Sequence, residues 1–148
     1  MWNVKTSVMI RKPLERHDGV VNSVAISPDG TKIASSSYDE IQLWSVKSQA
    51  PIGKPLEGHL MSHLLRFHMT AHLSSGFADG IQLWNVETGA KVGDPLHDHT
   101  DFVTSVACSP DGVHIASGSR GESVRLWNMG DILCDGPGFR HIRGPHSR

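Results

Sequence analysis

The sequence predicts an all-β fold built from a repeated unit of about forty residues. Three recurring phrases carry this prediction. A tryptophan returns at spacings of 42, 40 and 43 residues, at Trp2, Trp44, Trp84 and Trp127. A Pro-Leu pair followed, after two further residues, by a histidine recurs at residues 13–17, 55–59 and 95–99. The phrase at residues 20–37 returns at 102–119, displaced by 82 residues, which is two periods. Three markers in one register indicate a true repeat.

Local patterns inside each unit predict four short strands. Residues 21–27 and 104–109 alternate apolar and small polar side chains, which is typical of a strand with one buried face. Each run stops at Ser-Pro-Asp-Gly, which suits a tight turn because proline presets φ and glycine tolerates positive φ. A second strand, a third ending at the tryptophan and a fourth leading into the Pro-Leu pair complete the unit. Such a unit is typical of a β-propeller blade, so we predict a partial β-propeller of about three four-stranded antiparallel blades in an incomplete ring.

Composition and charge exclude several classes of protein. The 148 residues carry a formal net charge of -1, so no basic field points to nucleic acid. No apolar run approaches the length that spans a membrane. The two cysteines, Cys108 and Cys134, are too few for a disulfide framework, and the first residues lack the apolar core of a signal peptide. We therefore expect an intracellular, cytoplasmic protein, with the nucleus as an alternative, that needs no cofactor or metal and binds neither nucleic acid nor a membrane.

The repeated phrases resemble those of the WD-repeat β-propeller family, and the likeness extends over residues 2–129. They are similar in particular to the regular fungal-type repeats that are appended to NACHT-type NTPases. The resemblance implies that hydrogen bonds pin each blade. They join a histidine before the first strand, a serine in the second, an aspartate in the following turn and the tryptophan of the third. It assigns these roles to His17, Ser35, Asp39 and Trp44 in the first repeat, to His59, Ser75, Asp79 and Trp84 in the second, and to His99, Ser117 and Trp127 in the third.

The third repeat has no aspartate at the expected place, where Gly121 stands instead. We therefore expect a less satisfied polar network and a looser blade there. Serine, histidine and aspartate are also the residue types of a catalytic triad. Because the set recurs in successive repeats together with a tryptophan, the pattern favours a structural role, and we predict no enzyme. Phosphate-binding and nucleophile-elbow motifs are absent from the sequence.

The repeat boundaries divide the chain into five segments. Residues 1–16 are interpreted as the end of a missing blade with its connecting strand, 17–58 and 99–129 as blades, 59–98 as a degenerate blade, and 130–148 as a mobile tail. Propellers close with four to eight blades, so we interpret the chain as truncated, a fragment of a larger array. Open blades expose unpaired strand edges, which predicts self-association through those edges.

The middle repeat departs from the pattern. From histidine to tryptophan it takes 25 residues, against 27 in the first repeat and 28 in the third, and the Ser-Pro-Asp-Gly phrase is missing. Four histidines lie in its place, spaced as two i, i+4 pairs that a zinc ion could use: His59, His63, His68 and His72. A helix with an apolar stripe and a strand with alternating apolar residues are both compatible with residues 60–73.

A third interpretation is that residues 62–72 are the family phrase read out of frame. Met69 followed by Thr70 forces an aspartate codon in the shifted frame, and synonymous codons allow Thr-Ser-Val-Ala-Phe-Ser-His-Asp-Gly-Thr around it. On this hypothesis, residues 60–74 are a frameshifted motif and not a true insert. The segment that replaces the inner strand is then expected to be locally disordered or poorly packed. We favour this interpretation over the metal site.

Function is expected to reside in the loops. The chain is predicted to be a non-enzymatic scaffold for protein–protein interaction, with other proteins as its partners. Positions just before the first strand of a blade are candidate contacts, by analogy of position: Asp18, Val20, Asp101 and Phe102. Two alternatives stay open here. One is the nonfunctional product of a truncated or frameshifted gene, and the other is a small histidine-rich metal-binding protein.

Overall fold

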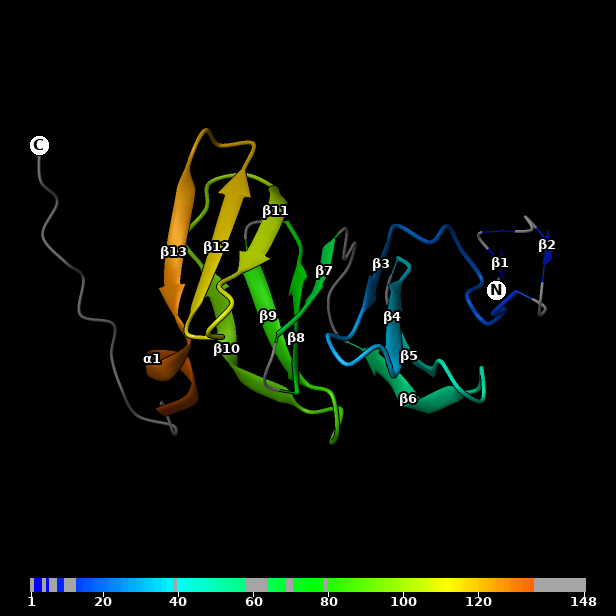
Figure 1. Cartoon of the computed structure of the whole chain (residues 1–148). Coiled ribbons are helices and arrows are strands. Elements are labelled where there is room, and N and C mark those ends of the chain that lie inside the picture. The colour runs from blue at the N-terminus through cyan, green and yellow to red at the C-terminus, as the bar shows by residue number, and fades with distance from the viewer. Residues whose placement is uncertain are drawn as a thin grey trace, which may run out of the picture.

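A computed structural model describes most of the chain as antiparallel sheets that stand side by side (Figure 1). The described residues are 2–3, 5, 8–9, 13–38, 40–57, 64–68, 71–78 and 80–134. Within them, three sheets of three or four strands follow one another along the chain. A short pair, β1 (Trp2–Asn3) and β2 (Val8–Met9), precedes them. The prediction of a nearly all-β chain of repeated antiparallel units is confirmed.

The first sheet contains four strands, each paired with the next in sequence. They are β3 (Ser23–Ile26), β4 (Lys32–Ser36), β5 (Glu40–Ser45) and β6 (Pro51–Glu57). The predicted tight turn joins β3 to β4, and its Gly30 has a φ of 69°. The Asp29 carboxylate accepts hydrogen bonds from Ser27 Oγ at 2.6 Å and Thr31 N at 3.0 Å. These bonds, the one from Ser27 foremost, lower the pKa of Asp29 to about 2.

The middle sheet also has four strands, although its sequence lacks the usual inner-strand phrase. They are β7 (Leu64–Phe67), β8 (His72–Gly76), β9 (Gly80–Asn85) and β10 (Lys91–His97). Leu65 and Phe67 of β7 are buried, so the expectation of a poorly packed inner strand is wrong for the described residues 64–68. The helical alternative is wrong there as well. Of the two patterns that the sequence left open, the strand with alternating apolar side chains is the one that forms, because Leu65 and Phe67 are buried against the first sheet.

The third sheet has three strands among the described residues. They are β11 (Val103–Cys108), β12 (His114–Ser119) and β13 (Val124–Asn128). A short helix, α1 (Met129–Cys134), follows β13 and contacts β10. Residues 130–134 therefore do not belong to a mobile tail as expected, because Met129 and Ile132 join the apolar cluster between the middle and third sheets. Residues 135–148 lie outside the described part. No helix in that part is long and apolar enough to cross a membrane.

The core lies between neighbouring sheets. One cluster joins Ile41 and Leu43 of the first sheet to Leu65, Phe67 and Leu73 of the middle sheet. A second cluster repeats this arrangement one sheet further along. Its buried members are Ile81, Leu83, Val103, Ile115 and Met129. Each sheet therefore buries apolar side chains on the face that meets its neighbour, which is how successive repeats of one unit build a continuous core.

Candidate functional site

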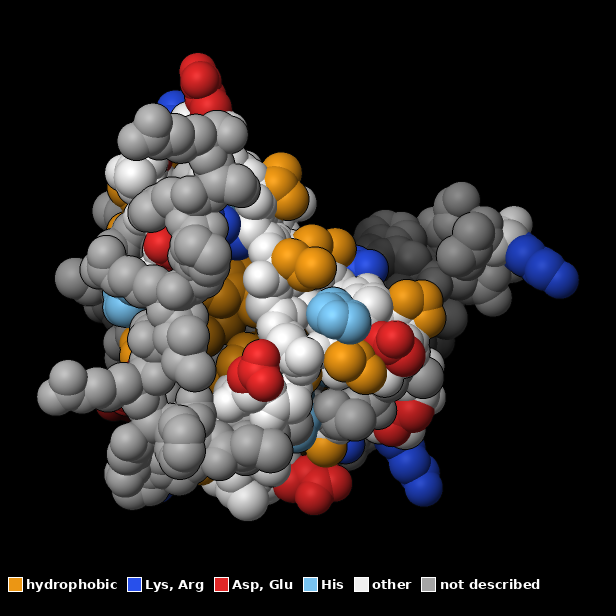
Figure 2. Space-filling view, turned by 90° about the vertical axis from the view of Figure 1, so that its left-hand side faces the viewer, with side chains coloured by type: hydrophobic (Ala, Val, Ile, Leu, Met, Phe, Trp, Pro, Cys, Tyr) orange, Lys and Arg blue, Asp and Glu red, His pale blue; other side chains and the backbone are white. Residues whose placement is uncertain are grey.

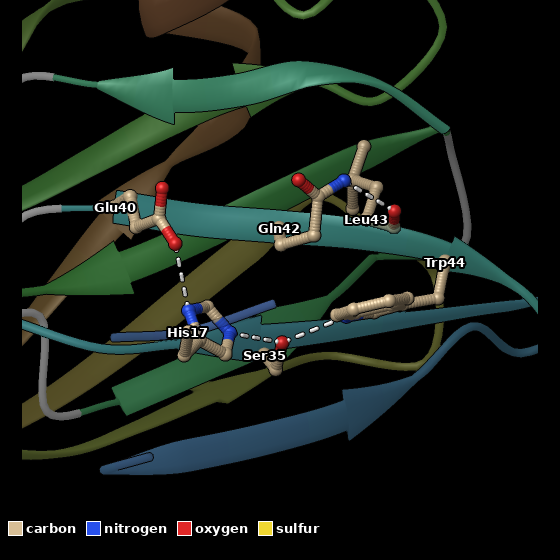
Figure 3. A network of polar contacts seen from close by, with 6 residues as sticks. All are labelled: His17, Ser35, Glu40, Gln42, Leu43 and Trp44. Atoms are coloured by element: carbon tan, nitrogen blue, oxygen red, sulfur yellow. Dashed lines mark hydrogen bonds and ion pairs between the residues drawn. The ribbon is translucent and has the colours of Figure 1, made fainter. Parts of the chain in front are cut away.

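The first sheet contains a chain of three hydrogen bonds that links its strands to the segment before them (Figure 3). Trp44 Nε1 donates to Ser35 Oγ at 2.8 Å, and Ser35 Oγ lies 2.6 Å from His17 Nε2. His17 Nδ1 lies 2.8 Å from Glu40 Oε1. The structure thus brings three of the predicted residues together, while Asp39 lies outside the described residues. Glu40 provides the carboxylate that contacts the histidine.

The donors in this chain can be assigned from chemistry. An indole N–H can only donate, so Ser35 Oγ accepts from Trp44. The serine hydroxyl is then free to donate to His17 Nε2, which makes Nδ1 the protonated nitrogen that donates to Glu40. The Trp44, Ser35 and His17 atoms of this hydrogen-bond network all have partners. Their hydrogen bonds offset the unfavourable burial of an indole and an imidazole.

The third sheet repeats the arrangement with one change of residue. Trp127 Nε1 donates to Ser117 Oγ at 2.9 Å, and His99 Nε2 lies 2.7 Å from the same oxygen. His99 Nδ1 lies 3.0 Å from Ser123 Oγ. The expectation of an unsatisfied network in this repeat is therefore wrong. Burial lowers the pKa of His99, with Arg125 adding to the effect, so the ring is neutral at physiological pH.

The turn at Gly121 differs from the turn that carries the aspartate in the first repeat. A Cβ at Gly121 would clash with Thr100 Oγ1, so the turn has no room for a side chain at this place. The backbone nitrogen of Gly121 donates to Ser119 Oγ at 3.0 Å. The turn before β13 is one residue longer than that before β5, and Glu122 absorbs the difference with a φ of 57°. Ser123, four residues before the tryptophan, therefore takes the place of Glu40.

The middle sheet shows only part of the network within the described residues. Trp84 Nε1 donates to Ser75 Oγ at 2.9 Å, and Ser75 Oγ lies 3.5 Å from the Gln82 carbonyl oxygen. His59 and Asp79 lie outside the described residues. Gly80 stands where Glu40 stands in the first sheet, and a Cβ there would lie 2.9 Å from the Leu96 carbonyl oxygen. The middle repeat therefore has no side chain at that position to contact a histidine.

The histidine cluster of the middle repeat is divided by the fold. His59 and His63 lie outside the described residues, whereas His68 is buried at the end of β7. His68 Nε2 lies 3.3 Å from Cys108 Sγ, and no described residue forms a hydrogen bond with its buried Nδ1. Burial, followed by the nearby charges of His72 and Arg66, lowers the pKa of His68 to about 4. Over the described residues, no three metal-binding side chains converge on one point.

His68 takes a turn position that serine occupies in the other repeats. Its backbone nitrogen donates to the His72 carbonyl at 2.9 Å, as Ser27 N does to Lys32 and Ser109 N does to His114. Burial raises the pKa of Cys108 to about 11, so the thiol is protonated and donates to His68 Nε2. The pair is an inter-sheet contact between β7 and β11.

The four predicted contact residues lie in the loops that lead into β3 and β11, along one edge of the array (Figure 1). Asp18, Val20, Asp101 and Phe102 are all exposed. The loop before β11 is held by three hydrogen bonds. Phe102 N donates to Asp101 Oδ1 at 2.7 Å, Arg120 N donates to the Phe102 carbonyl at 3.0 Å, and Ser119 Oγ donates to the Asp101 carbonyl at 2.8 Å. We call this edge the rim.

The rim of the first blade also carries apolar side chains that sequence reasoning did not single out. Val21, in the loop before β3, and Tyr38, in the turn between β4 and β5, are both exposed. A Cβ at Gly19 would lie 2.8 Å from Tyr38 Cδ2, so the tyrosine ring rests on the glycine.

The family comparison rests on two matched segments. The sequence model of the WD40 family, described as "WD domain, G-beta repeat", matches residues 8–45 and 91–128, which together are just over half of the 148 residues. The chain belongs to the WD40 repeat family. The three sheets are thus WD40 blades, and the matched segments include the histidine, serine and tryptophan of the first blade and those of the third.

Individual relatives extend the WD40 likeness. Striatin-3 of Rattus norvegicus is 47% identical over 36 residues, which are 24% of this chain and 4% of the relative. Apoptotic protease-activating factor 1 of the same organism is 31% identical over 132 residues, 88% of this chain and 7% of the relative. The chain therefore spans only a small part of the curated relatives it matches. These matches leave the resemblance to repeats appended to NACHT-type NTPases as a prediction.

The WD40 fold is also shared with solved structures. The crystal structure of RRP9 WD40 repeats superposes with a TM-score of 0.75 at 24% identity, over 80% of this chain and 38% of that one. The prediction of a partial β-propeller is thereby confirmed. The first and third WD40 blades place their serine–histidine–tryptophan contacts in the interior and the loops that lead into β3 and β11 on the rim.

Proposed function

We propose that this chain is a non-enzymatic scaffold that binds other proteins through the rim of its WD40 blades, as part of a larger propeller. The observation that carries the proposal is the exposure of apolar side chains on the rim, where hydrogen bonds hold the loop before β11 in place. Phe102 is 38% exposed although it is flanked by three such bonds. On the first blade, Val20 and Tyr38 are exposed apolar side chains on either side of Gly19's contact with the tyrosine ring.

Such a surface is suited to binding because its ordering cost is low. A loop that is already fixed loses little conformational entropy when a partner docks, and an aromatic side chain offers large apolar contact area. Carboxylates stand next to both patches, at Asp18 and Asp101. We therefore expect a partner segment that presents an apolar side chain and a lysine or arginine, since opposite charges favour encounter and fix orientation.

The serines and histidines of the blades support a structural role over catalysis. Ser35 and Ser117 are buried, and each hydroxyl already contacts an indole nitrogen and an imidazole nitrogen. A nucleophilic serine needs a free line of approach to a substrate carbonyl and donors for the developing oxyanion. Because both hydroxyls are buried and already hydrogen-bonded, we assign them to pinning the blades.

The test is an affinity purification from cells with the wild-type chain, a rim variant and a matched control. The rim variant carries Val20→Ser and Phe102→Ser. The control carries Val113→Ser, an exposed valine in the β11–β12 turn at the opposite edge. Quantitative mass spectrometry should show a defined set of proteins that the control retains and the rim variant loses. Retention of the same proteins by the rim variant contradicts a binding role for the rim.

A further inference from the structure

Two sheet faces at the ends of the array expose apolar side chains that the inner faces bury. On the third blade, Val124 is 79% exposed and Leu126 is 71% exposed. The same repeat positions are Ile41 and Leu43 in the first blade and Ile81 and Leu83 in the second, and all four are buried. We call the face with Val124 and Leu126 the trailing face. Figure 2 looks onto this side of the molecule and shows hydrophobic side chains at its surface.

At the opposite end of the array, the first blade also exposes apolar side chains on one sheet face. Val24 and Ile26 of β3 are each 65% exposed, and we call their face the leading face. The equivalent residues of the middle blade are Leu65 and Phe67, which pair with β8 as Val24 and Ile26 pair with β4. Leu65 and Phe67 are buried against the first blade. The β1–β2 pair leaves the leading face exposed.

Leading and trailing faces already meet within this chain. The first cluster joins the trailing face of the first blade, with Ile41 and Leu43, to the leading face of the second, with Leu65 and Phe67. The second cluster repeats the same type of contact between the second and third blades. The exposed trailing face of the third blade is therefore equivalent to the two faces that pack against a leading face inside the chain.

Over its three described strands, the trailing face of the third blade resembles that of the first. Across the first sheet the cross-strand neighbours are Ala25, Ala34 and Leu43, and across the third sheet they are Ala107, Ala116 and Leu126. Small side chains on two strands and a leucine on the next give the two faces similar surfaces over three strands, and β6 of the first sheet adds Leu56. The cross-strand neighbours of Val24 and Ile26 are Ser35 and Ile33, which are uncharged.

We propose that the exposed faces bind a second copy of this chain head to tail, with Val24 and Ile26 of one copy against Val124 and Leu126 of the next. The contact continues the blade-to-blade interface that the chain makes twice internally. Such a contact is heterologous, because each copy uses two different surfaces. Successive copies therefore close into a ring or continue as a growing series. The faces carrying these residues lie apart from the rim residues, so this association is independent of the rim proposal.

The decisive experiment uses two full-length variants that each lose one face. Val24→Asp with Ile26→Asp removes the leading face, and Val124→Asp with Leu126→Asp removes the trailing face. All four positions are exposed, so both variants should fold, which circular dichroism checks. Val113→Asp, which adds a carboxylate at an exposed valine outside both faces, is the matched control. Sedimentation velocity from low to high micromolar concentrations gives the mass of each species.

The wild type and the control should form species larger than the 16.1 kDa of one chain, and each double variant alone should be a monomer. An equimolar mixture of the two variants should form a dimer and nothing larger, because one intact face remains on each partner. A wild type that stays monomeric overturns the proposal, and a further blade of a longer chain then covers the faces. A variant mixture that stays monomeric while the wild type associates also overturns it. Rim-dependent capture of partners is unaffected by either result.

Discussion

The pinning network predicts opposite outcomes for two neighbouring buried serines on β4. Ser35 Oγ accepts from Trp44 Nε1 and contacts His17 Nε2, at 2.8 Å and 2.6 Å. Ser36 Oγ, one residue along, is buried but has no hydrogen-bond partner among the described residues. Ser35→Ala therefore leaves two polar nitrogens without a partner, whereas Ser36→Ala removes a hydroxyl that contributes no hydrogen bond.

The size of the effect follows from the two orphaned groups. Each buried donor or acceptor left unsatisfied costs about 1–3 kcal/mol, so Ser35→Ala, which leaves two, should lower the free energy of unfolding by about 2–6 kcal/mol. This is a large fraction of the roughly 5–15 kcal/mol that stabilises a typical domain. Ser36→Ala should change the free energy of unfolding by less than about 0.5 kcal/mol, or raise it slightly, because burying an unpaired hydroxyl is itself unfavourable.

Equilibrium unfolding in urea, followed by tryptophan fluorescence and by far-ultraviolet circular dichroism, measures both values. The denaturant slope should be the same for the two variants, which shows that the stability itself changes. Equal losses in the two variants would refute the reasoning, since loss of any buried serine hydroxyl would then have the same effect.

Three other predictions follow from particular residues. Because the pKa of His68 in the folded chain is about 4, against 6.5 for an unperturbed histidine, the unfolded state binds more protons between those values. Stability should fall as pH drops from about 6.5 to about 4, by up to about 3 kcal/mol, and urea titrations of His68→Ser should show a weaker fall. Gly121→Ala should lower the melting temperature, because its Cβ clashes with Thr100, while Gly118→Ala, with its nearest neighbour at 3.8 Å, should leave it nearly unchanged. The coding DNA across residues 62–72 should spell a Ser-Pro-Asp-Gly-like phrase in the third-base frame, and any other spelling rejects the frameshift interpretation.

The repeat phrases predicted most of the fold because each part of them has a local physical reason. Alternating apolar residues formed the strands, and Ser-Pro-Asp-Gly formed the turns in the first and third blades. The inner strand of the middle blade was not expected, because its turn is one residue shorter and lacks that phrase. Burial of Leu65 and Phe67 against the first blade stabilises it, and that burial depends on tertiary packing.

The hydrogen-bond network inside the blades could be predicted only in part from the sequence. The contacts of Ser35 and Ser117 with histidine and tryptophan follow the family pattern, whereas Glu40 and Ser123 were missed. Counting forward from the histidine placed the third partner at Gly121, because the longer turn shifts the register by one residue. Counting four residues back from each tryptophan identifies both partners. Helix α1 was missed because packing of Met129 and Ile132 stabilises it, and six residues have little intrinsic helical stability.

Hydrogen exchange of the tryptophan indole N–H groups tests the central claim most directly, which is that serine hydroxyls pin the WD40 blades from inside. Trp44 and Trp84 are buried and donate to Ser35 and Ser75. Their indole resonances, assigned by single Trp→Phe variants, should exchange with deuterium over hours, and Ser35→Ala should accelerate exchange at Trp44 far more than at Trp84. Complete exchange of both indoles within the dead time of the experiment would contradict the account.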